Sequence, residues 1–320
     1  VGVLTSGGDS PGMNACIRAV VRTLIYNKVD AVGIEDGYAG LINNQMKEMN
    51  YSSVSGIIQK GGTVLGSARS KEFMTKEGRK LAYANLQKNN IEGLIVIGGD
   101  GTFTGASIFG EEFNVPIIGL PGTIDNDLYG TDFTIGFDTA LNTIVECVDK
   151  IRDTASSHHR LFLVEVMGRD AGFLALHSGI SVGAEDILIP EMKTSLDELV
   201  TKLEKSKELK KSSIVIVAEG DDAGGAFSVA NQIKPKLPWI DLRVSILGHI
   251  QRGGSPTAKD RIIASVLGVE SVNALLKGES MSMVGIKNRK PELVTFAKAI
   301  KHHNKPDMTK LNYLNMLSAI

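Results

Sequence analysis

The sequence predicts an α/β protein of two three-layer α/β/α domains, with mostly parallel sheets and an active site in the cleft between the domains. Short, nearly continuous apolar runs alternate with longer amphipathic stretches, and six predicted strands end in glycine beside a charged or hydroxyl residue. Continuous apolar runs are typical of parallel strands covered on both faces, and their alternation with helices predicts βαβ units in Rossmann-like domains. The length of 320 residues favours two domains of ordinary size.

The predicted strands are short runs rich in valine, isoleucine and leucine. They cover residues 1–4, 93–97, 116–120, 161–166, 186–189, 213–218 and 242–247. No repeat period, low-complexity tract or proline-rich linker marks a domain border, so we expect two lobes joined by several chain crossings.

Two amphipathic helices are indicated clearly between these strands. Residues 139–151 place their apolar side chains on one face with 3.6-residue spacing. Residues 194–211 open with a capping box, in which Glu198 follows Ser195 by three positions, and end in lysines that suit the negative pole of a helix.

Charge and cysteine content narrow the classes of function. The formal net charge of −1 argues against a protein that holds nucleic acid by bulk electrostatics, so anionic ligands would have to be bound by local arginines. Cys16 and Cys147 are the only cysteines, too few to stabilise a fold of this size by disulfides, and we expect buried thiols in a reducing cytosol. No secretory signal pattern and no apolar run near the roughly 20 residues of a membrane span is present, which favours a cytoplasmic protein.

Polar and glycine-rich turns follow six of the predicted strands. These turns are residues 5–9, 98–101, 121–127, 167–169, 219–220 and 248–254. One such turn is ordinary loop chemistry. Because ligands bind at the carboxyl ends of parallel strands, six of them predict a ligand-binding cleft.

Two of the turns contain Gly-Gly-Asp, at residues 7–9 and 98–100. Glycines let backbone N–H groups approach an oligophosphate, a following helix adds a favourable dipole, and the aspartate can hold Mg²⁺. The alternative is a simple tight turn. A Walker motif is absent because Ser67 and Ala68 follow Gly66, and a dinucleotide fingerprint fails because Gly105 comes one residue late.

The segment 123–127 places two carboxylates, an amide and a hydroxyl directly behind an apolar strand. An aspartate-rich metal loop or turn is one interpretation. Phosphoryl transfer to an alcohol needs a carboxylate to accept the hydroxyl proton and donors for the migrating group. Asp125 and Thr123 fit those two roles.

Arginines and one histidine lie at or beside the same strand ends. Guanidinium groups match phosphate geometry and oppose the charge of a phosphoryl transition state. Any one arginine alone is better explained as a surface residue, whereas the set of arginines favours phosphate binding. The histidine could be a buried imidazole with its hydrogen bonds satisfied, and we favour a hydrogen bond to sugar or phosphate. The arginines are Arg69, Arg160, Arg169, Arg243 and Arg252, and the histidine is His249.

These motifs, in this order and spacing, resemble those of bacterial ATP-dependent 6-phosphofructokinases. The resemblance runs from residue 1 to about 256 and is looser beyond. It implies phosphoryl transfer from Mg-ATP to the 1-hydroxyl of fructose 6-phosphate, the committed step of glycolysis. The segments that carry it are residues 4–14, 66–69, 98–101, 121–127, 167–169, 219 and 248–256.

The resemblance implies catalytic and nucleotide-binding roles. Asp125 would be the base toward the sugar hydroxyl, and Asp100 would hold Mg²⁺. The transferred phosphoryl group would be stabilised by Thr123, Arg69, Arg169 and the backbone of Gly8. ATP would lie along Gly8, Tyr38, Arg69, Ser70, Gly99, Asp100, Gly101 and Thr102.

It implies a sugar-phosphate site and an oligomer as well. Fructose 6-phosphate would contact Thr123, Ile124, Asp125, Met167, Gly168, Arg169, Glu219, His249 and Arg252. Arg160 and Arg243 would reach the 6-phosphate from a neighbouring subunit, in a homotetramer with shared active sites. We expect residues 1–136 and 252–303 to form the ATP-binding domain, and residues 137–251 and 304–320 the fructose 6-phosphate-binding domain.

The phosphoryl donor is predicted from two glycines. Pyrophosphate-dependent relatives typically carry aspartate where Gly101 stands and lysine where Gly122 stands. A carboxylate at position 101 would repel the α-phosphate of ATP, and a lysine at position 122 would take space and charge beside the donor. The two glycines therefore favour ATP.

The resemblance also implies a second nucleotide site between subunits, for ADP or phosphoenolpyruvate. It matches Arg18, Arg22, Arg152, Gly183, Glu185, Lys210, Lys211 and Ser212. Tyr51, Gly56 and Ser212 stand where relatives often have arginine, aspartate and histidine. Losing a cation weakens an anion site, so we expect altered or reduced effector binding.

Three alternatives remain open at this level. A pyrophosphate-dependent phosphofructokinase is one. The NAD and lipid kinases that share Gly-Gly-Asp-Gly-Thr, matched by residues 98–102, are another, although they would not need the turns at 123–127 and 248–254. A non-catalytic nucleotide-sensing subunit is the third, and it predicts loss of Asp125, Arg69 or Arg169, all of which are present.

Overall fold

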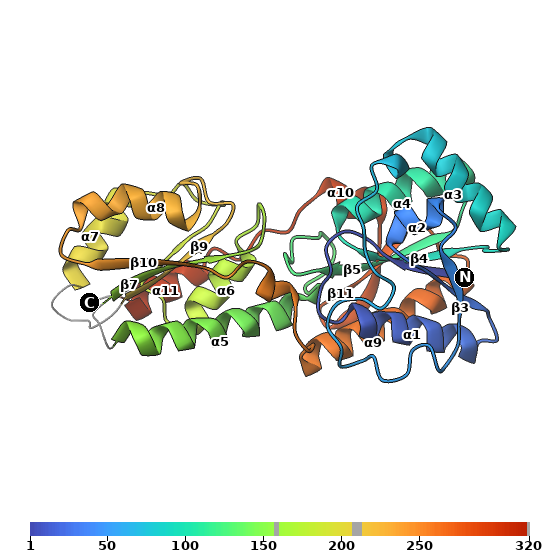
Figure 1. Ribbon diagram of the computed structural model, residues 1–320, viewed down its shortest axis with the longest axis horizontal. Helices are drawn as coiled ribbons and strands as arrows, with labels where there is room; N and C mark the ends of the chain where they lie inside the picture. The colour runs from blue at the N-terminus through green and yellow to red at the C-terminus, as the bar shows by residue number, and fades with distance from the viewer. Residues whose placement is uncertain (157–159, 207–212, 319–320) are drawn as a thin grey trace. The chain divides into compact units, whose positions relative to one another are not determined.

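The computed structural model describes residues 1–156, 160–206 and 213–318 (Figure 1). Two compact units are distinguished by their internal contacts. Unit 1 comprises Val1–Ile124, Leu128–Thr139 and Arg252–Asn304, and unit 2 comprises Asp125–Asp127, Ala140–Gln251 and Lys305–Ile320. The chain therefore passes between the units several times, while the expected assignment of one substrate to each domain stays a prediction.

Unit 1 is built on an eight-stranded sheet with the order β12-β11-β5-β4-β1-β2-β3, and β6 pairs with β5. Its central pairs are parallel, while β3 and β12 add antiparallel edges. The strands are β1 (Gly2–Thr5), β2 (Ala31–Ile34), β3 (Met46–Met49), β4 (Leu94–Gly98), β5 (Ile117–Thr123), β6 (Ile135–Gly136), β11 (Ser282–Lys287) and β12 (Lys290–Thr295). Because Thr5 pairs with Ile97 and Gly98 with Pro121, the turns after β1, β4 and β5 emerge at the same edge.

Helices cover both faces of this sheet (Figure 1). One face carries α1 (Met13–Tyr26) and α9 (Ala258–Leu276). The other face carries α2 (Gly37–Ile42), α3 (Lys76–Lys88), α4 (Asp100–Phe113) and α10 (Phe296–Lys301), with the short 3₁₀ helix η1 (Glu72–Met74) beside them.

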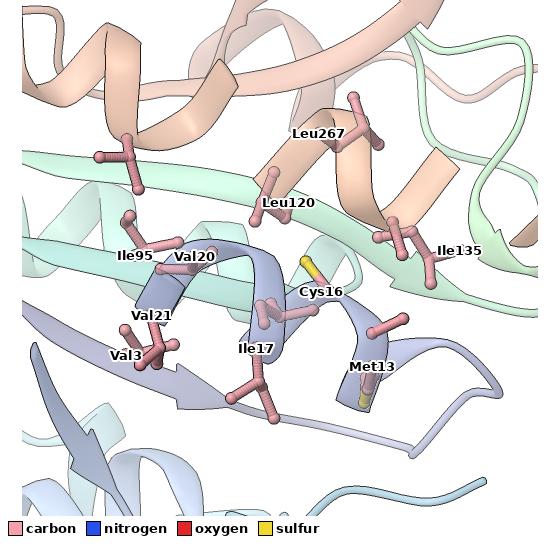
Figure 2. Close-up of a cluster of buried hydrophobic side chains, with 14 of the residues drawn as sticks. Val3, Met13, Cys16, Ile17, Val20, Val21, Ile95, Leu120, Ile135 and Leu267 are labelled. Atoms are coloured by element: carbon pink, nitrogen blue, oxygen red, sulfur yellow. The ribbon is translucent and has the colours of Figure 1, made fainter. Parts of the chain in front are cut away.

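The core of unit 1 lies on both sides of the central strands. Val3 and Ile95 join the cluster under α1, whereas their neighbours Leu4 and Val96 join the cluster under α4, as the alternation of a strand requires. Figure 2 shows Cys16 inside the first cluster. Burial raises the pKa of its thiol, so it is a packing residue rather than a nucleophile.

Unit 2 is built on a four-stranded parallel sheet with the order β10-β7-β9-β8. Its strands are β7 (Arg160–Val166), β8 (Asp186–Leu188), β9 (Ser213–Ala218) and β10 (Asp241–Ile246). In Figure 1, α7 (Leu196–Ser206) and α8 (Gly225–Ile233) cover one face, and α5 (Phe137–Ser156), α6 (Phe173–Ser181) and α11 (Lys310–Ser318) lie on the other. The 3₁₀ helices η2 (Lys234–Lys236) and η3 (Gly248–Arg252) flank β10, and Trp239, the one tryptophan of the chain, lies in the turn before it.

The predicted α/β class is confirmed, and the predicted strands correspond to β1, β4, β5, β7, β8, β9 and β10. The predicted helix at 139–151 is the middle of α5. The helix expected at 194–211 begins at Leu196, where the N–H of Glu198 donates to Ser195 Oγ over 3.4 Å, and its expected end lies outside the described residues. Within the described part of the chain, no helix is both long and apolar enough to cross a membrane.

Candidate active site

The turn after β1 is fixed to the start of α4. The N–H of Ser6 donates to the carbonyl of Ile97, and Thr102 Oγ1 donates to the carbonyl of Ser6 over 3.1 Å. Gly7 adopts a φ of +87°, which a side chain would disfavour. The two Gly-Gly-Asp turns therefore lie together at the positive end of a 14-residue helix, an arrangement suited to an oligophosphate.

A side chain at Gly8 would displace the Arg252 guanidinium. A Cβ built on this glycine would overlap the Arg252 guanidinium, and Arg252 Nη1 donates to the carbonyl of Asp9 over 3.3 Å. The structure thus brings the expected sugar-phosphate residue Arg252 against the expected nucleotide residue Gly8, both within unit 1.

Asn14 holds the start of the glycine-rich loop that leads to Arg69. Its side chain is buried, and its Nδ2 donates to the carbonyls of Lys60 and Gly61 over 3.1 Å each. Its Oδ1 accepts from the N–H of Val64 over 2.7 Å. The sequence motif contained Asn14, but its role as a clamp was not predicted.

Two hydroxyls fix the end of the same loop. Thr5 Oγ1 donates to the carbonyl of Gly66 over 2.6 Å, and Ser67 Oγ donates to the carbonyl of Gly7 over 2.6 Å. Arg69 follows directly and is exposed. The backbone that carries this arginine is therefore held against the turn after β1.

Tyr38 supports the start of α4. Its hydroxyl donates to the carbonyl of Thr102 over 2.6 Å, and its ring stacks on Phe73 with centroids 4.0 Å apart. Burial raises the pKa of the phenol. The hydroxyl oxygen can still accept a hydrogen bond, but Tyr38 is only 5% exposed, and its expected contact with ATP stays a prediction.

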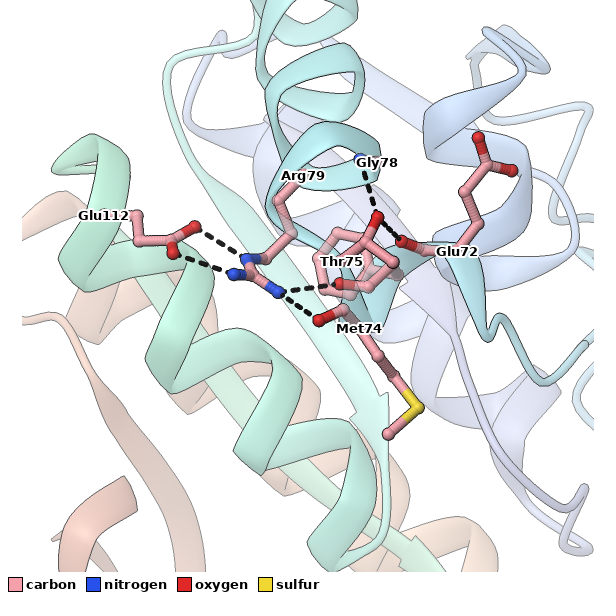
Figure 3. Close-up of polar contacts among 7 residues, drawn as sticks. Glu72, Met74, Thr75, Gly78, Arg79 and Glu112 are labelled. Atoms are coloured by element: carbon pink, nitrogen blue, oxygen red, sulfur yellow. Dashed lines mark hydrogen bonds and ion pairs between the residues drawn. The ribbon is translucent and has the colours of Figure 1, made fainter.

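Arg79 anchors the segment that carries Phe73 (Figure 3). Its Nη1 donates to the carbonyls of Phe73 and Met74 over 3.1 and 2.8 Å. Its Nε and Nη2 donate to Oε2 and Oε1 of Glu112 in α4 over 2.6 and 2.8 Å. One guanidinium therefore ties η1 to α3 and α4.

The Thr-Ile-Asp-Asn-Asp segment begins at the last residue of β5, Thr123. Asp125 is 5% exposed and Asn126, which adopts a φ of +57°, is 4% exposed. The backbone therefore turns sharply behind β5 and places the carboxyl group of Asp125 largely out of water.

The two glycines that were expected to discriminate between phosphoryl donors differ in their surroundings. A Cβ on Gly101 would meet no atom within 4 Å. A Cβ on Gly122 would lie 2.9 Å from Cγ2 of Ile97 and 3.1 Å from Cε of Met13. A lysine at position 122 would therefore require the core to move, in addition to any effect on the donor.

In unit 2, two side chains shape the turn after β7. Glu219 Oε1 accepts from the N–H groups of Gly168 and Arg169 over 3.3 and 2.9 Å. Gln251 is fully buried, accepts from the N–H of Met167 over 3.1 Å, and donates to the carbonyl of Gly248 over 2.9 Å. These bonds hold Arg169 at a φ of +53°, which is uncommon outside glycine, with its side chain exposed.

The arginines expected at the 6-phosphate share one carboxylate. Arg160 Nε donates to Asp241 Oδ2 over 2.7 Å, and Arg243 Nε lies 2.9 Å from Asp241 Oδ1. The hydrogen bond from Arg160 helps to hold the pKa of Asp241 below its usual value. His249 is exposed in η3. Asp241 was not predicted from the sequence.

The expected effector residues divide between the units. Arg18 and Arg22 lie on α1 in unit 1, where Arg22 stands over the ring of Tyr51 at 5.5 Å. In unit 2, Arg152 donates to the carbonyls of Val182 and Gly183, and Glu185 is buried. The remaining candidates, Lys210, Lys211 and Ser212, lie outside the described residues.

Comparisons with known proteins agree in pointing to one family. A family model described as Phosphofructokinase matches residues 1–275. ATP-dependent 6-phosphofructokinase 2 of Bacteroides thetaiotaomicron is 56% identical over 319 residues, which cover 99% of this chain and 98% of that relative. ATP-dependent 6-phosphofructokinase 1 of Thermus thermophilus is 55% identical over 302 residues, covering 94% of each chain.

Solved structures match over nearly the whole chain. Phosphofructokinase from Saccharomyces cerevisiae matches with a TM-score of 0.89 and 39% identity, covering 99% of this chain and 47% of that one. A pyrophosphate-dependent phosphofructokinase from Marinobacter aquaeolei matches with a TM-score of 0.85 at 20% identity, covering 100% of this chain and 91% of that one. The second likeness concerns the fold alone.

Proposed function

The chain belongs to the phosphofructokinase family, and from this premise we propose how its residues carry out ATP-dependent phosphorylation of fructose 6-phosphate. The reaction moves the γ-phosphoryl group of ATP to the sugar 1-hydroxyl and gives fructose 1,6-bisphosphate and ADP, the committed step of glycolysis. Relatives more than half identical are named ATP-dependent, and both Gly101 and Gly122 agree with that donor. The family match also favours this reaction over those of the NAD and lipid kinases.

Asp125 is the proposed base. As the 1-hydroxyl oxygen forms its bond to the γ-phosphorus and the bond to the β-phosphate oxygen breaks, the Asp125 carboxylate accepts the hydroxyl proton. The observation that carries this assignment is a carboxyl group only 5% exposed, two residues beyond the end of β5. Thr123, the last residue of β5, supplies a hydroxyl donor for the transferred group.

Positive groups stabilise the transferred phosphoryl group in this proposal. The backbone of Gly8 and the N-terminal end of α4 present donors and a favourable dipole. Arg69 and Arg169 oppose the charge that develops on the equatorial oxygens. Arg69 lies two residues after Ser67, whose Oγ donates to the carbonyl of Gly7, so the backbone that carries this charge is held beside the turn after β1.

Magnesium is the proposed cofactor, held by Asp100. Mg²⁺ typically keeps several waters and takes one or two carboxylates together with substrate phosphates. Asp100 fits that donor set, because it opens α4 where the phosphates are expected and its Oδ1 accepts a bond from the N–H of Gly101 over 2.7 Å. The bound ion would neutralise charge on the β- and γ-phosphates.

Fructose 6-phosphate is proposed to bind mainly to residues of unit 2. Since Oε1 of Glu219 accepts two backbone N–H groups, its Oε2 is the oxygen suited to a sugar hydroxyl. Arg160 and Arg243 would bind the 6-phosphate of a neighbouring subunit. The other contacts proposed are Ile124, Met167, Gly168, Arg169, His249 and Arg252.

A cytoplasmic homotetramer is proposed as the working form, with ADP or phosphoenolpyruvate as effector. The family resemblance supports both proposals. Tyr51 occupies a place where relatives often have arginine, and it faces Arg22 at 5.5 Å. Replacing a cation with an aromatic ring lowers the positive charge available to an anionic effector, so its affinity should be reduced.

A coupled assay of ADP release tests the reaction and its base. Asp125→Asn preserves size and removes the base, so kcat should fall by roughly 10²–10⁴-fold. Asp197→Asn, an exposed carboxylate of α7 in an ion pair with Lys236, serves as the matched control. Turnover with pyrophosphate but not with ATP would overturn the donor, and near-normal activity of Asp125→Asn would remove it from its role.

A further inference from the structure

Asp241 lies between the two arginines expected at the 6-phosphate. In the parallel pairing of β7 and β10, Asp241 is the direct neighbour of Arg160 across the ladder. Arg243 follows two residues later on β10 and therefore projects from the same face as Asp241. The order of the sheet places β10 at its edge, where these side chains remain partly exposed.

The single carboxylate engages both guanidinium groups. Arg160 meets Oδ2 through Nε at 2.7 Å. Arg243 meets Oδ1 through Nε at 2.9 Å and Oδ2 through Nη2 at 3.1 Å. Since a guanidinium carries five N–H donors, each arginine retains terminal N–H groups beyond those that Asp241 takes. The two guanidinium groups and the carboxylate together carry a net charge of +1, so they still attract a phosphate dianion.

We propose that Asp241 is a positioning residue for fructose 6-phosphate, which orients Arg160 and Arg243 before the sugar phosphate binds. This inference rests on the proposed function, which assigns both arginines to the 6-phosphate. Nothing in the sequence motifs singled out Asp241, because its role depends on the register between β7 and β10.

Asp241 has two opposing effects on the affinity for fructose 6-phosphate, and the larger of them decides whether the residue raises or lowers that affinity. Its negative charge repels an incoming phosphate, but the side chain is 42% exposed, and charges in a watery, salt-containing setting interact weakly. Against this, a long arginine side chain loses rotamer freedom when it is immobilised, which lowers affinity about two- to tenfold for each side chain not already ordered. Orientation of two arginines therefore outweighs the repulsion.

Kinetics of Asp241→Asn test the inference in the intact enzyme. We expect the KM for fructose 6-phosphate to rise roughly tenfold, while kcat and the KM for ATP stay near their wild-type values. Asp241→Glu retains two carboxylate oxygens and should restore most of the affinity. Asp197→Asn removes another exposed, ion-paired carboxylate of unit 2 and should leave the KM for fructose 6-phosphate unchanged.

A lower or unchanged KM for fructose 6-phosphate in Asp241→Asn would overturn the inference. Asp241 would then only compete with the 6-phosphate for the arginines, or have no effect on binding. A double-mutant cycle adds a second criterion. In a background of Arg160→Ala and Arg243→Ala, Asp241→Asn should have no further effect on the KM, and a full effect there would also count against positioning. If Arg160→Ala and Arg243→Ala themselves leave the KM unchanged, the assignment of these arginines in the proposed function fails instead.

Discussion

Gly101 and Gly122 show how two residues of the same type can be required for different reasons. The first faces open space at the start of α4, where a nucleotide is proposed to bind. The second is enclosed by Ile97 and Met13 in the core of unit 1. Side chains at the two positions should therefore have separable consequences for stability and for donor binding.

Alanine substitutions measure this separation. Gly122→Ala should lower the free energy of unfolding by about 1–3 kcal/mol, because its Cβ overpacks the core. Gly101→Ala should raise that free energy by about 0.4–1 kcal/mol through loss of backbone entropy in the unfolded chain, and should increase the KM for ATP. Urea denaturation and initial rates report the two effects. Equal stability of the two variants would contradict this account.

Residues that act through distant partners were beyond the reach of sequence reasoning. Asp125, Arg69 and Arg169 carry side-chain chemistry that a motif displays directly. Asn14, Gln251 and Asp241 matter through backbone groups or side chains 46 to 84 positions away, which become neighbours only on folding. The sequence does contain one signal for such residues: a polar residue within or beside a recognised motif. Its role becomes clear only when folding buries it or brings it to its partner.

At the scale of secondary structure, the sequence predicted the fully buried strands β4 and β9 and also the exposed edge strand β10. β4 and β9 are continuous apolar runs with every residue buried. It missed the largely buried strands β2 and β11. Of the other missed strands, β3 and β12 are edges with exposed, charged residues, and β6 is two residues long. Their formation depends on pairing with a neighbour rather than on an apolar pattern of their own.

Arg79 joins η1, α3 and α4, and its replacement should destabilise this junction. Arg79→Met removes two charge-assisted bonds to Glu112 and two bonds to backbone carbonyls. Because the Glu112 side chain keeps 27% exposure and can rehydrate, we expect a loss of about 2–3 kcal/mol rather than the larger cost of stranding a buried charge. Lys150→Met, which breaks the exposed pair with Glu146, is the control and should change stability little.

The same junction should depend on pH in a defined direction. The hydrogen bond from Arg79 holds the pKa of Glu112 below its ordinary value of 4.5. The ion pair therefore contributes its full stability above pH 4.5 and loses it as the pH falls through the lowered pKa of the folded state. In urea unfolding, the difference in the free energy of unfolding between wild type and Arg79→Met should be constant near neutral pH and should become smaller in acid. If that difference became larger in acid, the ion pair between Arg79 and Glu112 would not be the source of the stability.

At the scale of the whole molecule, family membership follows from a match across nearly the full chain rather than from any single motif. The sequence predicted two α/β lobes joined by several chain crossings, and the structure has two compact units, each built from discontinuous segments. Arg160 and Arg243 lie on neighbouring strands of the sheet of unit 2, and we propose that they serve the active site of a neighbouring subunit.

Mixed oligomers test that proposed sharing. Asp125→Asn subunits keep Arg243, and Arg243→Ala subunits keep Asp125. If Arg243 serves a neighbouring subunit, dissociating and reassembling an equal mixture should regenerate some intact sites and give activity well above the mean of the two parents. Activity equal to that mean would place Arg243 and Asp125 of the same subunit in one site. Reassembled homogeneous samples provide the baseline.

Trp239 gives the enzyme a built-in optical reporter. It is the chain's one indole, it is 38% exposed, and it stands two positions before Asp241 in the turn that leads into β10. Emission excited at the red edge of protein absorbance thus arises from a single residue, close in sequence to Asp241 and remote in sequence from the Gly-Gly-Asp turns. A titration with sugar phosphate can be followed by a shift in the emission wavelength of Trp239 or by quenching of its fluorescence, without attaching a dye.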